Sequence, residues 1–287
     1  MSAAPTNSAR LLSETEQAVI DPDEALPFGH FAPDRWQAAL IAIAKTTPLH
    51  RGAFRRRVTK LITGSPARTV DVWFRGCAYR LRDPGNLIEN GLLLHPRYNA
   101  ADIDFLLEGA GPNGTFVDIG ANIGLYTLPL AKRVGENGKV VAIDANPLMA
   151  RRLQWNAAAS ALGNVSVFPC AVSDHEGSGS LRIHKDDAAI VSLEDDIEGS
   201  IPIRTLPSIL AESRVQHIDG LKIDIEGHED RVLAPFIETC DPALLPGRIV
   251  IEHLPGNIDY PACAAAFAKR GYRLADRSRN NSFYLRG

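Results

Sequence analysis

The segment LKIDIEGHED, residues 221–230, brings ionisable side chains to the end of an apolar stretch. Apolar residues alternate there with Lys222, Asp224 and Glu226, which is the period of a β-strand. Charged side chains are costly inside a sheet that is covered on both faces. A carboxylate at a strand end can orient a hydroxyl group and take its proton, so Asp224 and Glu226 are candidate catalytic bases. His228 is a third candidate base, and Lys222 is expected to hold Glu226 or Glu252 in a fixed position.

A second motif has the residue types of a nucleoside-binding site. FVDIGANIG, residues 116–124, ends an apolar strand near Asp118 and supplies Gly120 and Gly124. Such glycines allow a tight turn and a close approach of the backbone to a ligand. Asp144 ends the next apolar strand, 24 residues after Gly120, where an acid can hold the two hydroxyl groups of a ribose.

The loop residues distinguish between two classes of cofactor. A dinucleotide site requires G-x-G-x-x-G, but Asn122 and Leu125 stand at the positions of the second and third glycines. Asp118 would repel a pyrophosphate and would attract an ammonium group. The loop therefore favours S-adenosylmethionine, which has a ribose, a neutral linker and an amino-acid head. An NAD-dependent oxidoreductase and an α/β protein without a nucleotide remain alternatives.

Strands and helices alternate through the second half of the chain. Apolar strands are expected at residues 115–120, 139–144, 165–170, 221–224 and 248–253. Helices are expected after these strands, ending near residues 134, 161, 237 and 271. The alternation predicts an α/β, doubly wound, mostly parallel sheet. Two final strands, joined by a turn at residues 278–281, would add an antiparallel strand at one edge.

These blocks, taken in order, resemble the FkbM family of S-adenosylmethionine-dependent methyltransferases. The resemblance covers roughly residues 92–253 and is carried by FVDIGANIGLYT, VVAIDANP, AVSDHEG and LKIDIEGHE followed by VIEH. It implies a class I methyltransferase fold, which is Rossmann-like, with the methyl donor as cosubstrate. It also implies transfer to a hydroxyl oxygen of a sugar or another natural product.

The resemblance assigns roles to residues at matching positions. The donor-binding set is Asp118, Gly120, Asn122 and Gly124 in the loop, Asp144 at the ribose, and Ala171 and Asp174 near the adenine. The motif of the fourth parallel strand matches at Lys222, Asp224, Glu226, Gly227 and Glu229. The chain departs from the family at Asn99 and Pro207, where acids are common, and both departures concern recognition of the acceptor.

The resulting hypothesis is an O-methyltransferase that acts on a carbohydrate, a glycolipid or another natural product, with an anionic acceptor as an option. N-methyl transfer, methylation of a polyketide hydroxyl and a non-catalytic binding protein remain open. Mg²⁺ could be held by Asp224, Glu226 and Glu252, because it prefers oxygen ligands. A bound Mg²⁺ ion is not expected, however, and no residue is assigned as a metal ligand.

The chain divides by composition into a flexible N-terminus at 1–32, a basic extension of helices and short strands at 33–91, and the methyltransferase domain at 92–287. Between Lys45 and Arg82 there are ten Lys or Arg residues and one acid, Asp71. This cluster could be a solvated surface, or it could bind an anionic acceptor or, through residues 51–60, a membrane surface. A strand at 180–184 precedes an acidic insert at 186–198, which is a candidate lid or substrate loop.

The bulk composition limits the classes of binding partner and the cellular compartment that can be expected. Of the 287 residues 45% are hydrophobic and 23% charged, and the formal net charge of −3 gives no case for nucleic-acid binding. The four cysteines lack the paired spacing of a zinc site or a disulfide framework, which suits a reducing compartment. Without a bilayer-spanning apolar run or a signal peptide, a cytoplasmic protein is expected.

Overall fold

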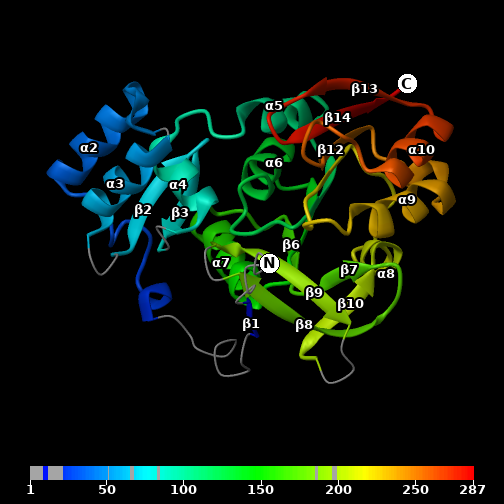
Figure 1. Cartoon of the computed structure of the whole chain (residues 1–287), viewed down its shortest axis with the longest axis horizontal. Helices are drawn as coiled ribbons and strands as arrows, with labels where there is room; N and C mark the ends of the chain where they lie inside the picture. Colours follow the sequence, from blue (N-terminus) through cyan, green and yellow to red (C-terminus); the bar gives the residue numbers. More distant parts are fainter. Residues whose placement is uncertain are drawn as a thin grey trace, which may run out of the picture.

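A seven-stranded sheet is the largest element of the fold (Figure 1). The computed structural model describes residues 9–11, 22–50, 52–64, 68–82, 85–184, 187–195 and 199–287. The strand order in this sheet is β13-β14-β12-β11-β4-β5-β6. The parallel strands are β4 (Thr115–Ile119), β5 (Lys139–Ile143), β6 (Val165–Phe168), β11 (Gly220–Ile223) and β12 (Arg248–Glu252).

The chain closes with the predicted hairpin of β13 (Tyr272–Arg277) and β14 (Asn281–Arg286). Strand β14 runs antiparallel to both β12 and β13. The antiparallel strand therefore lies one position inside the edge, and β13 is the edge strand. The mostly parallel α/β sheet predicted from the sequence is confirmed.

Helices cover both faces of this sheet, because successive side chains of a strand point to opposite faces. Phe116 and Val250 pack in one core cluster with α5 (Ala100–Glu108), α6 (Thr127–Val134) and α7 (Pro147–Ala159). Val117 and Ile251 pack in the opposite cluster with α8 (Leu206–Glu212), α9 (Glu229–Thr239) and α10 (Pro261–Lys269). The sheet is thus doubly wound. Pro129 is the third residue of α6, close to the helix start, where a proline is tolerated.

The basic extension packs on the end of α7. It contains α2 (Arg35–Thr46), α3 (Gly52–Thr63), β2 (Val70–Phe74), β3 (Cys77–Leu81) and α4 (Leu87–Leu94). The backbone N–H of Ala78 donates to Ser160 Oγ at 2.8 Å, which fixes the β2–β3 hairpin beside α7. The predicted domain boundary at residue 91 lies inside α4, whose Leu92 belongs to the core cluster of α5 to α7.

Part of the basic cluster is structural. Arg80 is 2% exposed and forms a bidentate pair with Asp71, with Nε–Oδ1 and Nη2–Oδ2 distances of 2.7 and 2.9 Å. A buried guanidinium with a bidentate partner stabilises the hairpin without offering a surface to a ligand. Any docking function of the basic cluster must therefore come from its other residues.

A smaller sheet lies beside the main one. Its path is β1 (Ala9–Leu11), β8 (Gly177–His184), β10 (Ile201–Thr205) and β7 (Ala171–Ser173), and β9 (Asp187–Asp195) pairs with β8. The predicted strand at 180–184 is part of β8. The acidic insert at 186–198 lies partly in β9 and partly outside the described residues, so its lid role stays a prediction.

The segment predicted to be a flexible N-terminus, 1–32, is described only in part. Its described residues include β1 and a short 3-10 helix, Pro22–Ala25. Among the described helices, none combines the length and the apolar character that crossing a bilayer requires.

Candidate functional site

A cavity of about 830 Å³ opens at the carboxyl ends of β4, β5, β11 and β12. This is the edge at which open α/β sheets bind ligands. Its volume lies toward the upper end of the range for ligand pockets, roughly 300–1,000 Å³. The cavity is lined by residues of the loop after β4, the ends of β5, β11 and β12, the N-terminus of α5 and the β13–β14 turn.

The loop between β4 and α6, residues 120–125, is here called the donor loop. Gly120 has φ +78°, and a Cβ on it would lie 2.0 Å from the backbone oxygen of Asp224. Only glycine therefore lets the donor loop cross the end of β11. Gly120 and Asn122 line the cavity, whereas Gly124, at φ +97°, lies against Leu128 instead.

Asp144 is held by the donor loop at the end of β5. Its Oδ2 accepts a hydrogen bond from the Asn122 backbone N–H at 2.6 Å, and its Oδ1 accepts one from the Asn146 N–H at 2.8 Å. Burial raises the pKa of Asp144 to about 6, although both N–H groups oppose that shift. The carboxylate lines the cavity in a fixed orientation, with lone pairs left for hydroxyl groups.

Two acids of the predicted donor-binding set lie outside the cavity lining. Ala171 lines the cavity, but Asp118 and Asp174 do not. Asp118 is fully buried, and its Oδ2 accepts a hydrogen bond from the Thr127 hydroxyl at 2.5 Å. Burial raises its pKa. Asp174 is exposed and bonded to Arg231 at 2.9 Å, which holds its pKa well below the usual range.

Lys222 of β11 forms an ion pair with Asp224, which directly follows the strand. The sequence did not predict this pair. Lys222 is 1% exposed, and its Nζ lies 3.2 Å from Asp224 Oδ2. The structure thus pairs Lys222 with Asp224, whereas the sequence suggested Glu226 or Glu252 as its partner. Residues two apart in a strand share a face, so Lys222 meets Asp224 before it can reach another strand.

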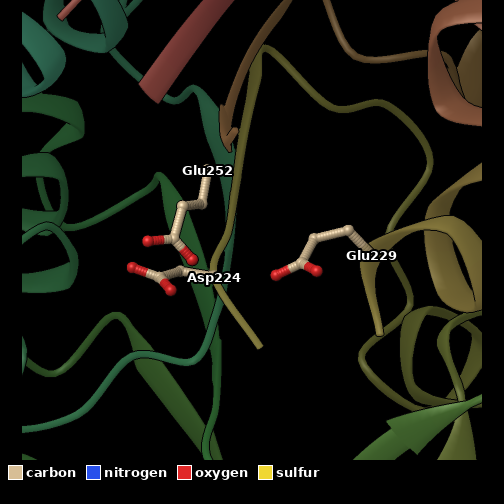
Figure 2. Close-up of side chains that lie close together, drawn as sticks. All are labelled: Asp224, Glu229 and Glu252. Carbon is tan, nitrogen blue, oxygen red and sulfur yellow. The ribbon is translucent and has the colours of Figure 1, made fainter. Parts of the chain in front are cut away.

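Asp224 lies beside Glu252 of β12 and near Glu229 of α9 (Figure 2). One carboxylate oxygen from each of the three lies within 4.8 Å of the others. Burial raises the pKa of Glu252 to about 8, and the negative charge of Asp224 adds to that shift. Glu252 therefore keeps its proton to a higher pH than an ordinary glutamate, and it does so beside the Lys222–Asp224 ion pair.

Glu229 has a different task, which is to hold the turn after β11. It is fully buried, and its two oxygens accept hydrogen bonds from the N–H groups of Ile225 and Gly227 at 2.8 and 2.9 Å. Glu226 and Gly227 have φ values of +55° and +101°, which reverse the chain. Glu226 is exposed, and it lines the cavity together with His228.

The same oxygen cluster could hold a divalent cation. The structure brings together the carboxylates of Asp224, Glu229 and Glu252. The sequence analysis considered Glu226 in place of Glu229. Both oxygens of Glu229 already accept backbone hydrogen bonds.

Sequence patterns missed several cavity residues. Asp102, Tyr126 and Asn281 line the cavity, as do Arg97 and Arg279. Only Tyr126 belongs to a motif quoted above, FVDIGANIGLYT, where it directly follows the donor loop. The other four residues belong to no motif of recognisable spacing.

Comparison with known proteins identifies the family. The family model described as "Methyltransferase FkbM domain" matches residues 118–274. No curated protein matches the chain.

Solved structures with a similar arrangement include TYW2 of M. jannaschii in complex with AdoMet, at 16% identity over 76% of this chain and 87% of that chain, TM-score 0.40. A SAM-dependent O-methyltransferase of Thermotoga maritima matches at 14% identity over 73% of each chain, TM-score 0.41. A precorrin-6y C5,15-methyltransferase of Geobacter metallireducens matches at 12% identity over 67% of this chain and 87% of that chain, TM-score 0.41. The family model spans more than half of the chain, from the end of β4 into β13, and the chain therefore belongs to the FkbM family of S-adenosylmethionine-dependent methyltransferases.

Proposed function

We propose that the protein transfers a methyl group to a hydroxyl oxygen of a carbohydrate or glycolipid that also carries an anionic group. The observation that carries the proposal is the pairing of Asp224 with the buried Lys222 beside Glu252, at the edge of the cavity that the donor loop borders. A hydroxyl is a poor nucleophile, so a positioned carboxylate is the group that its methylation needs.

S-adenosylmethionine supplies an electrophilic methyl group on a sulfonium sulfur. Asp224 accepts the proton of the acceptor hydroxyl as the oxygen–carbon bond forms and the sulfur–carbon bond breaks. The ion pair with Lys222 orients Asp224, and Glu252 lies beside Asp224. A base of this kind contributes about 10²–10⁴-fold. Glu226 and His228 stay candidates for contacts with the acceptor.

The donor site is assigned to the residues that fit a ribose and an adenine. Gly120 provides backbone without a side chain, and the Asn122 side chain is turned to the donor loop, where its Oδ1 accepts from the Ile123 N–H at 2.9 Å. Asp144 accepts from the ribose hydroxyls. Ala171 is small enough to leave room for the adenine beside β7. These contacts bind the donor in a defined orientation, which is worth up to about 7–11 kcal/mol of the barrier in well-aligned reactions.

Replacing Asp144 tests the ribose contact. We expect Asp144→Ala to raise the dissociation constant of S-adenosylhomocysteine about 10- to 100-fold, since hydrogen bonds to a charged group contribute about 1.5–3 kcal/mol. Turnover at saturating donor should change little. Isothermal titration calorimetry measures the affinity, and Asp174→Ala serves as a control because Asp174 does not line the cavity. Unchanged affinity of Asp144→Ala would contradict the ribose role.

The anionic acceptor is inferred from three arginines that line the cavity. They come from separate segments: Arg55 from α3, Arg97 from the loop before α5, and Arg279 from the β13–β14 turn. In the described ranges of the chain, none of the three has a carboxylate partner within ion-pair distance. Helix α3 also exposes Phe54 and Leu61, which would suit an acceptor presented by a membrane surface.

Removing these charges should weaken acceptor binding selectively. We expect the Arg55→Ala, Arg97→Ala and Arg279→Ala triple variant to raise the acceptor KM at least tenfold, because each lost charge-assisted hydrogen bond costs about 1.5–3 kcal/mol. Methyl transfer from labelled donor is measured with neutral glycans and with their phosphorylated or carboxylated counterparts. The acceptors are supplied in solution and as glycolipids in vesicles. Arg56→Ala and Arg57→Ala are matched controls on α3 that do not line the cavity. If the wild type used neutral and anionic acceptors equally well, the proposal of an anionic group on the acceptor would be wrong. If it methylated only amines, the proposal of transfer to oxygen would be wrong.

A further inference from the structure

Helices α2 and α3 form the outer part of the basic extension, at one end of the molecule (Figure 1). Gln37 Nε2 of α2 donates to the backbone oxygen of Ile62 of α3 at 2.7 Å. The Thr59 hydroxyl of α3 donates to Asn90 Oδ1 of α4. The inner sides of the two helices are thus joined to each other and to the rest of the fold.

The outer side of each helix exposes two large apolar side chains. Trp36 and Ile43 of α2 are 68% and 49% exposed, and Phe54 and Leu61 of α3 are 56% and 68% exposed. The members of each pair are seven residues apart, which is two helical turns, so each pair forms an apolar stripe along its helix. Both helices bury other apolar residues in the core. The exposed stripes are therefore additional to the ones that hold the fold together.

This gathering of apolar side chains sets the extension apart from the rest of the surface. Among the large hydrophobic side chains exposed in the described residues, Ile258 and Leu274 are the ones that lie outside the extension. Single apolar residues are normal on a protein surface, whereas several close together mark an interaction site. The stripes of α2 and α3 are such a gathering.

The surface around the stripes is cationic. Residues 35–70 contain eight Lys or Arg residues and no Asp or Glu, although the whole chain has a formal net charge of −3. Arg56, Arg57 and Lys60 are exposed on α3, and within the described ranges none of the three has a carboxylate at ion-pair distance. A partner that complements this surface must therefore combine negative charge with apolar material.

An anionic lipid bilayer combines both. Helices that bind at a membrane surface carry Lys and Arg beside Trp, Phe and Leu, and their apolar side chains enter about 5–10 Å into the boundary between headgroups and acyl chains. Trp36 suits that depth, because tryptophan is enriched at the interface between membrane and water. The phosphates of a nucleic acid would match the basic residues but would leave Ile43 and Leu61 without an apolar contact.

The distribution of charge would also orient the protein on a bilayer. Because residues 35–70 are basic and the whole chain is negative, the remainder is strongly acidic and is repelled by an anionic surface. The cavity reaches the attracted end. Arg55, next to Phe54, lines the cavity, and so does Leu87 of α4, which is 41% exposed. A lipid-linked molecule can therefore approach the cavity from the bilayer.

We propose that the outer sides of α2 and α3 form a docking face that binds reversibly to an anionic lipid bilayer. The residues of the docking face are apolar on one side and cationic on the other: Trp36, Ile43, Phe54 and Leu61, with Arg56, Arg57 and Lys60. The inference stands apart from the proposed function, because binding to a bilayer needs neither the methyl donor nor an acceptor.

Vesicle flotation with the full chain tests the docking face. The probes are vesicles of phosphatidylcholine alone and vesicles of phosphatidylcholine mixed with phosphatidylglycerol. We expect the wild type to bind the mixed vesicles at least about tenfold more tightly than the neutral ones, and added salt to weaken this binding.

Two double variants remove the two kinds of contact separately. Phe54→Ser with Leu61→Ser should weaken binding to the mixed vesicles at least about tenfold, because two apolar side chains no longer leave water. Arg56→Gln with Lys60→Gln should weaken it about 10- to 30-fold, because each basic residue near an anionic surface contributes about fivefold. The two variants are independent, so a folding defect in one leaves the other as a test.

Matched controls use exposed residues outside the docking face. Ile258→Ser with Leu274→Ser removes the same number of exposed apolar side chains. Arg214→Gln with Arg273→Gln removes the same number of exposed positive charges. Both controls should bind the mixed vesicles as the wild type does.

The docking face also divides the acceptor assays. Arg56→Ala and Arg57→Ala, which do not line the cavity, should behave as the wild type with acceptors in solution. With acceptors embedded in anionic vesicles, the same variants should lose activity in proportion to their loss of vesicle binding.

Calorimetry with S-adenosylhomocysteine separates docking from the donor site. No residue of the docking face lines the cavity, so each docking variant should bind this ligand as the wild type does. If the wild type failed to bind it, the proposed function would be contradicted and the vesicle result would stand.

The docking proposal is overturned if the wild type binds no vesicles, or if both docking variants bind the mixed vesicles as tightly as their controls. Sedimentation equilibrium covers the case of a protein partner. A dimer that both docking variants lose, in a wild type that binds no vesicles, would assign the face to a second copy of the chain instead.

Discussion

Asp224→Asn is expected to lower kcat by about 10²–10⁴-fold while the affinity for S-adenosylhomocysteine changes less than about threefold. The amide keeps the shape of the side chain but can no longer take the proton of the acceptor hydroxyl. Donor binding is spared because Asp144 and the donor loop are untouched. Single-turnover transfer of labelled methyl groups measures the rate. Glu226→Gln is the matched comparison, since Glu226 lines the same cavity on an exposed side chain. A larger loss in Glu226→Gln than in Asp224→Asn would make Glu226 the base.

The ion pair with Lys222 requires a control for folding. Breaking a fully buried pair by removing one partner costs about 3–5 kcal/mol, and the cost here is smaller because the Asp224 side chain is 40% exposed. The double variant Lys222→Met with Asp224→Asn removes both charges, so its Tm should recover relative to Asp224→Asn while kcat stays low. Recovery of kcat together with Tm would show that Asp224 acts only in folding.

The fold was predictable because its signals are local. Each parallel strand is a short apolar run, and Gly120 and Asp144 end two of them at a spacing that a nucleoside site requires. The carboxyl ends of parallel strands meet at one edge of a sheet, so Asp144, Asp224 and Glu226 could be assigned to one cavity from the sequence. The cavity lining includes all three.

The partners within the site were not predictable, because they depend on contacts between distant segments. Asp102 and Asn281 are 179 residues apart and meet only when the final hairpin packs against β12 beside α5. The raised pKa of Glu252 comes from burial and from Asp224 on the neighbouring strand. Asp118 illustrates the opposite error. Its position in the motif is unambiguous, and it shares a sheet face with Lys222, but its carboxylate lies deeper in the strand, is bonded to Thr127 of α6 and does not line the cavity.

Gly120→Ala is expected to abolish measurable donor binding or to weaken it more than tenfold. The added Cβ would lie 2.0 Å from the backbone oxygen of Asp224, so either the donor loop or the end of β11 must move. The residue would also keep φ +78°, where a non-glycine residue costs about 1–3 kcal/mol. Calorimetry with S-adenosylhomocysteine and thermal unfolding measure the two effects.

Gly124→Ala is a control that separates the effect of backbone strain from the effect of displacing the donor loop. Gly124 has φ +97°, but a Cβ there would meet the Leu128 side chain at 3.1 Å rather than backbone, and the residue does not line the cavity. Its Tm should fall because of the same backbone strain, while the donor affinity changes less than in Gly120→Ala. If both variants lost affinity in proportion to Tm, the loss would reflect general destabilisation. The close contact between Gly120 and Asp224 matters for binding only if Gly120→Ala loses affinity beyond that proportion, because this contact joins the donor loop to the residue that follows β11.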